Sequence, residues 1–138
     1  MRSLPDATDV SQLSERSLAW ISSLPSTLER RELEGPLLLC HAGGEDDMSR
    51  LAEDDHGYAL ASNGALRRVL DRGYRMMLCG HTHRPFVRRI EGLVIVNAGT
   101  LYREHGPGFT IVDLEARVAE RYRVEGARVR EDGRTALP

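Results

Sequence analysis

MMLCGHTHRP, residues 76–85, is the segment around which the rest of the chain is interpreted. Its short apolar run ends at Gly80 and is followed by His81 and His83, which only Thr82 separates. In an extended segment, side chains two residues apart point to the same face, so both imidazoles can face one metal ion or two adjacent ones. Gly80 lets the backbone turn sharply at the end of the strand. We therefore expect a buried strand that ends in a tight loop carrying two histidines.

Two further segments have the same form, an apolar run that ends in a polar residue and small residues. GPLLLCHAGG, residues 35–44, ends its apolar run in Cys40 and His41, and LVIVNAGT, residues 93–100, ends its run in Asn97. Ligand sites in α/β sheets lie at the carboxyl ends of the strands. The three strand ends are therefore expected to meet at one rim of a sheet.

The order and spacing of these motifs resemble the calcineurin-like metallophosphoesterase family. The later motifs of that family are a strand ending in His, then Gly-His-x-His, then Asn-x-Gly, and the resemblance covers roughly residues 13 to 124. It implies that His41 and His81 bind one metal ion of a dinuclear centre, that His83 binds the other, and that Asn97 is a further site residue. The implied reaction is hydrolysis of a phosphate mono- or diester. Histidine ligands suit divalent Mn, Fe, Zn or Ni.

The chain departs from the family in lacking the motifs of the family's first half, Asp-x-His, Gly-Asp and Asn-His-Asp/Glu. Asp54-Asp55-His56 is the nearest match, but it lies in an acidic loop and does not follow an apolar run. The chain thus resembles the C-terminal half of such a domain, and we expect its phosphoesterase site to be incomplete in this chain alone. The alternative is a non-catalytic relative that binds a partner, with a single metal ion.

The hydrophobic pattern predicts an α/β fold, a mixed β-sheet with flanking helices, over residues 11–125. By resemblance this is one half of the family's four-layer αββα sandwich. Residues 1–10 are interpreted as a disordered lead and residues 126–138 as a disordered charged tail. Helices are expected at residues 11–24, with an apolar stripe in the core, and at 62–72. Strands are expected before His41 and at residues 27–33, at an edge, and at 74–79, 86–90, 93–96, 109–114 and 118–124. The second helix lies between two buried strands in a β-α-β-like arrangement, and hairpins are expected at Glu91-Gly92 and around Glu115-Ala116.

The expected apolar face of the half-sandwich indicates a partner, whereas the net charge does not. A single half exposes the apolar face that the other half would cover, so we expect self-association or a chain that supplies the N-terminal half. The net charge of −2 gives no general case for a nucleic-acid surface. The apolar runs fall far short of the ~20 residues that span a bilayer, and the N-terminus lacks a signal pattern. We therefore expect a cytoplasmic protein that is not in the membrane.

Several residues near the motifs leave more than one interpretation open. Cys40 and Cys79 are interpreted as small buried apolar residues, against the alternative of a single zinc held by both thiols and two histidines. The six acidic residues between positions 45 and 55 indicate a solvated loop; the alternative is that this loop borders the metal centre. His56 and His105 are expected at the surface.

Thr82 and Arg84 are the remaining polar groups of the histidine loop that suit a phosphate. The Thr82 hydroxyl can lie near the substrate, and Arg84 is the nearest cation. A solvated arginine at the start of a strand is an equally good interpretation of Arg84.

Overall fold

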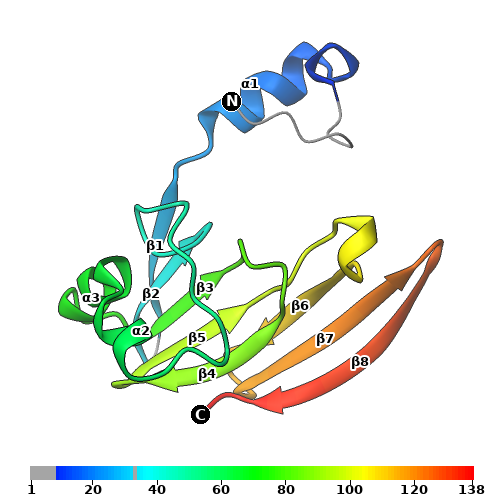
Figure 1. The fold of residues 1–138 in the computed structure, drawn as a ribbon. Helices are drawn as coiled ribbons and strands as arrows, with labels where there is room; N and C mark the ends of the chain where they lie inside the picture. Colours follow the sequence, from blue (N-terminus) through cyan, green and yellow to red (C-terminus); the bar gives the residue numbers. More distant parts are fainter. Residues whose placement is uncertain (1–8, 33) are drawn as a thin grey trace.

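The computed structural model describes residues 9–32 and 34–138, which form a mixed α/β arrangement of two β-sheets and short helices (Figure 1). The disordered lead expected at residues 1–10 lies almost wholly outside the described residues. The helical elements are η1 (Val10–Gln12), α1 (Glu15–Ser23), α2 (Tyr58–Ala61), α3 (Gly64–Asp71) and η2 (Arg103–His105). The strands are β1 (Thr27–Glu32), β2 (Gly35–Cys40), β3 (Met76–Cys79), β4 (Phe86–Ile90), β5 (Leu93–Asn97), β6 (Gly108–Asp113), β7 (Val118–Glu125) and β8 (Arg128–Ala136).

The first sheet has the strand order β1-β2-β3-β5-β4. Its three inner strands, β2, β3 and β5, are parallel, and the antiparallel strands β1 and β4 form the two edges. Helix α3 lies between β2 and β3 in the sequence, which confirms the predicted β-α-β unit. Strand β1 lies at the edge of the sheet, which confirms the position expected for residues 27–33. Leu33 itself lies outside the described residues. Parallel pairing brings the carboxyl ends of β2, β3 and β5 to one rim.

The hairpin between β4 and β5 agrees with the sequence. Glu91 and Gly92 connect the strands, with φ angles of 49° and 94°. Positive φ at both central residues is the mirror-image turn whose twist matches that of the flanking strands, and glycine adopts it readily. The turn fixes the register of β4, so that the chain leaves the histidine loop along the edge of the sheet.

The second sheet, β6-β7-β8, contains the clearest correction to the sequence prediction. The β6–β7 hairpin was expected, but the charged tail, expected to be disordered, forms β8 and pairs with β7 along its length. Opposite charges on neighbouring strands explain the difference, because such cross-strand pairs stabilise a sheet. Arg121 lies 2.6 Å from Asp132, and Arg134 lies 3.6 Å from Glu120.

Two apolar clusters lie on opposite faces of the first sheet. One cluster joins the sheet to α3 and includes Leu38, Met77 and Ile95. The other joins it to the second sheet, with Val96 on one side and Ala119 on the other. The expectation of a single sheet with a bare inner face is therefore corrected, because β6–β8 cover much of that face.

Part of the inner face stays uncovered at the β1–β2 edge. Leu28 and Leu39 are paired across these strands and are 46% and 45% exposed. Leu39 lies two residues after Leu37, which belongs to the cluster under the second sheet, so both point to that face. An apolar strip therefore continues beyond the second sheet into solvent.

Helix α1 was expected to bury its apolar stripe in the core, and this prediction is wrong. The helix begins after the cap Ser14 and not at Ser11, and it has no buried residue. Trp20 is 64% exposed and Ile21 is 48% exposed. The helix stands away from both sheets (Figure 1), so nothing in the described chain covers its stripe.

The second predicted helix is present but begins later than expected. Asn63, and not Ser62, caps α3 by accepting a hydrogen bond from the Leu66 backbone N–H at 2.9 Å. A separate short helix, α2, precedes it, and the strand expected from Tyr74 begins at Met76. Within the described residues, no helix is long and apolar enough to cross a membrane.

Leu137 provides a test of the second sheet. Its side chain is 6% exposed and packs in the cluster between the sheets. Replacing Leu137 with alanine should lower the free energy of unfolding by about 2 kcal/mol, since it removes buried methyl groups. The exposed Val129 of β8, the strand that ends directly before Leu137, is the control, and Val129→Ala should change the value by less than about 0.5 kcal/mol. Urea unfolding measures both; equal effects would contradict the packing described for β8.

Candidate metal centre

The histidine loop starts where β3 ends and is held between its two parallel neighbours. The Gly80 N–H donates to the His41 carbonyl at 2.9 Å, and the Ala98 N–H donates to the Cys79 carbonyl at 2.9 Å. These bonds extend the parallel pairing beyond the strands. The prediction that the ends of β2, β3 and β5 meet at one rim is confirmed.

The loop is tight, as predicted, but it is not extended. His81 and His83 have φ angles of 68° and 61°, in the left-handed region that side chains rarely adopt. The Thr82 N–H bonds to the Gly80 carbonyl at 2.8 Å, which closes a short turn. Positions of this kind persist only where surrounding contacts hold them. The alternation argument from an extended strand therefore does not apply here, and the two imidazoles have different neighbours.

Asn97 supplies the contacts that hold the loop. It is 1% exposed, and its Nδ2 donates to the Gly80 carbonyl and to the Thr82 hydroxyl oxygen, the latter at 3.1 Å. Its Oδ1 accepts from the Gly99 N–H at 3.0 Å. One buried amide thus joins the end of β5 to the loop after β3. Asn97 is therefore a buried residue that contacts the backbone and the Thr82 side chain of the histidine loop.

His41 and His81 face each other across the rim. The His41 Nε2 lies 3.3 Å from the His81 Nδ1, and the ring centroids are 5.2 Å apart at an angle of 78°. Two nitrogens that bind one tetrahedral zinc at about 2.0–2.1 Å lie about 3.3–3.4 Å apart. The separation therefore fits two ligands of one metal ion.

His83 pairs with His105, a residue expected to be an ordinary surface histidine. Their Nδ1 atoms are 2.7 Å apart, shorter than two ligands of a tetrahedral ion allow and typical of a direct hydrogen bond. Tyr102 packs edge-on to His105, with ring centroids 4.9 Å apart. Burial and the neighbouring histidines lower the pKa of His83, which favours its neutral form. His105 lies 22 residues beyond His83 in the sequence, so no local pattern predicts that the two side chains meet.

The structure places the other candidates away from these imidazoles. Glu45 forms an ion pair with Arg72 at 3.0 Å, and the Asp46 carboxylate accepts from the Met48 N–H at 3.1 Å. The acidic loop is anchored at Arg88, which donates to the backbone carbonyls of residues 52, 53 and 55. Over residues 9–32 and 34–138, no three His, Cys, Asp or Glu side chains gather closely enough to hold a metal ion.

Both cysteines belong to the apolar layer. Cys79 is buried in the cluster under α3, and Cys40 packs against the same cluster. Burial raises the pKa of Cys79 to about 12 and also raises the pKa of Cys40. In the described part of the chain no three His, Cys, Asp or Glu side chains gather, so the structure does not assemble the single zinc site of the alternative interpretation.

The comparisons with known proteins place the chain in a family. Residues 9–117 match the family profile of the calcineurin-like phosphoesterase superfamily domain. The chain belongs to this superfamily. No curated protein matches the chain in a sequence search.

Solved structures agree with the fold. Vacuolar protein sorting 29 (Vps29) from Cryptosporidium parvum aligns with a TM-score of 0.55 and 18% identity, over 82% of this chain and 58% of that protein. Vps29 from Entamoeba histolytica, solved with zinc, gives 0.54 and 19%, over 83% and 62%. A hypothetical protein from Pyrococcus horikoshii gives 0.60 and 16%, over 92% and 46%. The chain thus spans about three fifths of the length of these Vps29 proteins.

The buried amide of Asn97 can be tested directly. Asn97→Ala should lower the free energy of unfolding by about 2–3 kcal/mol, because the Gly99 N–H and the Thr82 hydroxyl lose their partner and the Gly80 carbonyl loses one of its two donors. The imidazole NMR signals of His81 and His83 should shift as the loop relaxes. Asn63→Ala, which removes the cap of α3, is the matched control: it should lower stability by about 1 kcal/mol and leave those signals in place. Unchanged signals in Asn97→Ala would show that the amide does not position the loop.

Proposed function

We propose that this chain is the histidine-bearing part of a metal-dependent phosphoesterase, which hydrolyses a phosphate mono- or diester. The observation that carries the proposal is the 3.3 Å separation of His41 Nε2 and His81 Nδ1, which suits one tetrahedral metal ion. Membership of the calcineurin-like superfamily supports the reaction class. The zinc in Entamoeba histolytica Vps29 supports metal binding on this fold.

In this proposal each loop residue has a separate role. His41 and His81 bind the first ion, and His83 binds a second ion once its hydrogen bond to His105 opens. The ions are divalent Mn, Fe, Zn or Ni; when bound, they polarise a phosphoryl oxygen and lower the pKa of water. The Thr82 hydroxyl accepts from Asn97 and can donate its own proton to a phosphate oxygen. Arg84, exposed at the end of the loop, attracts the anion.

We further propose that the site is completed by a second copy of this chain or by another chain that supplies the N-terminal half. Two histidines provide only part of a metal coordination shell, so the other ligands must come from elsewhere. The exposed apolar residues Trp20 and Ile21 of α1, with Leu28 and Leu39 at the β1–β2 edge, suit such a partner. The two free cysteines fit a reducing cytoplasm.

A second candidate function is a non-catalytic subunit of the same fold that holds a single metal ion. The observation that favours it is the absence, within the described part of the chain, of any group of three ligand side chains. The 2.7 Å bond between His83 and His105 also favours one metal site over two. Metal binding without hydrolysis would support this candidate.

Metal binding is the first test. Titration of the metal-free chain with Zn²⁺ or Mn²⁺ by calorimetry should show binding that His41→Ala and His81→Ala each weaken, by about tenfold or more. His56→Ala removes an exposed histidine outside the rim and should bind as the wild type does. If His56→Ala weakens binding as much as the other two variants, the ion is held nonspecifically and the proposed centre is wrong.

Hydrolysis is the second test. With Mn²⁺ added, the wild-type chain should hydrolyse a chromogenic phosphodiester or monoester, and His81→Ala should reduce the rate to background. If a second copy completes the site, the rate per chain should rise with protein concentration. Metal binding without turnover at any concentration would favour the non-catalytic subunit or a site that another chain completes.

A further inference from the structure

An arginine-lined cavity lies beside the histidine loop, between the two sheets. Its volume is about 200 Å³, and its lining includes His83 and His105 at the loop and Arg121 and Arg123 on β7. A second cavity, of about 310 Å³, adjoins it and shares Arg121 among its lining residues. The described arginines of β7 therefore border the same space as the histidine pair.

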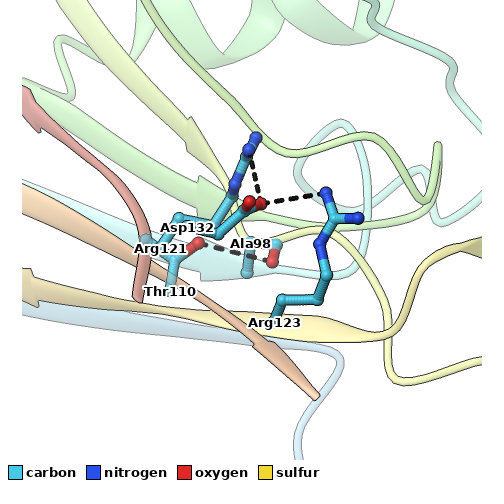
Figure 2. Close-up of polar contacts among 5 residues, drawn as sticks. All are labelled: Ala98, Thr110, Arg121, Arg123 and Asp132. Carbon is cyan, nitrogen blue, oxygen red and sulfur yellow. Dashed lines mark hydrogen bonds and ion pairs between the residues drawn. The ribbon is translucent and has the colours of Figure 1, made fainter. Parts of the chain in front are cut away.

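Asp132 holds the two arginines of β7 in place. Figure 2 shows both guanidinium groups directed at its carboxylate, with Arg121 at 2.6 Å and Arg123 at 3.2 Å. Burial raises the pKa of Asp132, but the hydrogen bonds and charges of Arg123 and Arg121 outweigh it, so the pKa is lowered. The carboxylate is thus ionised and fixes the guanidinium groups, each of which has further N–H donors.

The cavity carries more positive charge than its carboxylate neutralises. Arg84, Arg121 and Arg123 line it with Asp132 as the one acidic residue among the lining residues, which leaves two positive charges from three arginines and one aspartate. The Nε of Arg121 is the one buried side-chain nitrogen or oxygen in residues 9–32 and 34–138 that lacks a hydrogen-bond partner. The guanidinium groups that line the cavity have further N–H groups that can donate to an anionic oxygen.

The second sheet is joined to the rim at this point. The Thr110 hydroxyl of β6 donates to the Ala98 carbonyl, which follows β5, at 3.4 Å (Figure 2). The arginines are thereby fixed relative to the strand end that supplies Asn97. The histidine pair and the arginines thus line one cavity in this arrangement of the two sheets.

We propose that Arg84, Arg121 and Arg123 form an anion subsite, and that the substrate carries a second anionic group in addition to the phosphate at the histidines. The first part concerns binding alone; the second part depends on the proposed phosphoesterase function. The arginine fork suits either a phosphate or a carboxylate. The substrate class is therefore a small phosphate ester with a further phosphate or carboxylate on its leaving group.

The test is metal-free binding, measured by calorimetry in EDTA. The probes are methylphosphonate, phosphonoacetate and alkylene diphosphonates of increasing length. The wild-type chain should bind a diphosphonate or phosphonoacetate about tenfold more tightly than methylphosphonate, through charge-assisted hydrogen bonds. Tighter binding of a diphosphonate identifies the second anionic group as phosphate, and tighter binding of phosphonoacetate identifies it as carboxylate. Equal binding of all probes would overturn the proposal.

Variants assign the binding to the cavity. Arg121→Ala and Arg123→Ala should each weaken the doubly charged probes about tenfold, and Arg121→Lys, which keeps the charge but loses the fork, should have an intermediate effect. Arg130→Ala is the matched control, because Arg130 of β8 also forms a cross-strand ion pair, with Glu125 of β7 at 3.6 Å, but lies outside the cavity lining. Its affinity should stay within about twofold of wild type. If Arg130→Ala and Arg121→Ala lose affinity for the doubly charged probes equally, the ion pairs act only on the structure of the sheet and the anion subsite is wrong.

The two proposals can fail separately. Binding in EDTA needs neither metal nor turnover, so a chain that binds diphosphonates but hydrolyses nothing contradicts the phosphoesterase alone. A chain that hydrolyses simple esters without preferring doubly charged probes contradicts the arginine subsite alone. Circular dichroism of each variant confirms that a loss of binding does not come from unfolding.

Discussion

The parallel pairing of β2, β3 and β5 is the constraint on which the rest of the structure depends. It continues past the strands through the bonds from Gly80 to His41 and from Ala98 to Cys79. Because the three strands end together, side chains far apart in the sequence meet at one rim. The buried Asn97 then keeps the loop in a backbone conformation that His81 and His83 would not adopt unaided. The metal-like spacing of His41 and His81 follows from these bonds.

The second sheet contributes both stability and chemistry. Its apolar side covers Met76 and Val96 of the first sheet, and its charged residues pair across β7 and β8. One of these pairs, Arg121 with Asp132, borders the cavity beside the histidines. The same charged residues therefore stabilise the sheet and line the cavity. For this reason, a binding experiment needs an ion-paired arginine elsewhere on the sheet as its control.

The chain leaves apolar surface at one side of the fold. Helix α1 buries no residue, and Leu28 and Leu39 are about half exposed at the sheet edge. Two imidazoles facing each other would likewise provide only part of a metal coordination shell. A partner that covers the apolar face and supplies the missing ligands would explain both features.

The sequence by itself determined the elements whose signals are local. Alternating or continuous apolar runs marked the inner strands, Glu91-Gly92 marked a hairpin, and glycine with closely spaced histidines marked the loop. The approach of strand ends also followed, because parallel strands with a helical crossover have only one such edge. The tertiary structure decided what depends on distant partners. Helix α1 was expected in the core but packs on nothing in the described chain. Strand β8 was expected to be disordered, but its charged residues pair with those of β7. His105 and Arg121 had no local signal, since their surroundings come from segments brought together only when the two sheets pack.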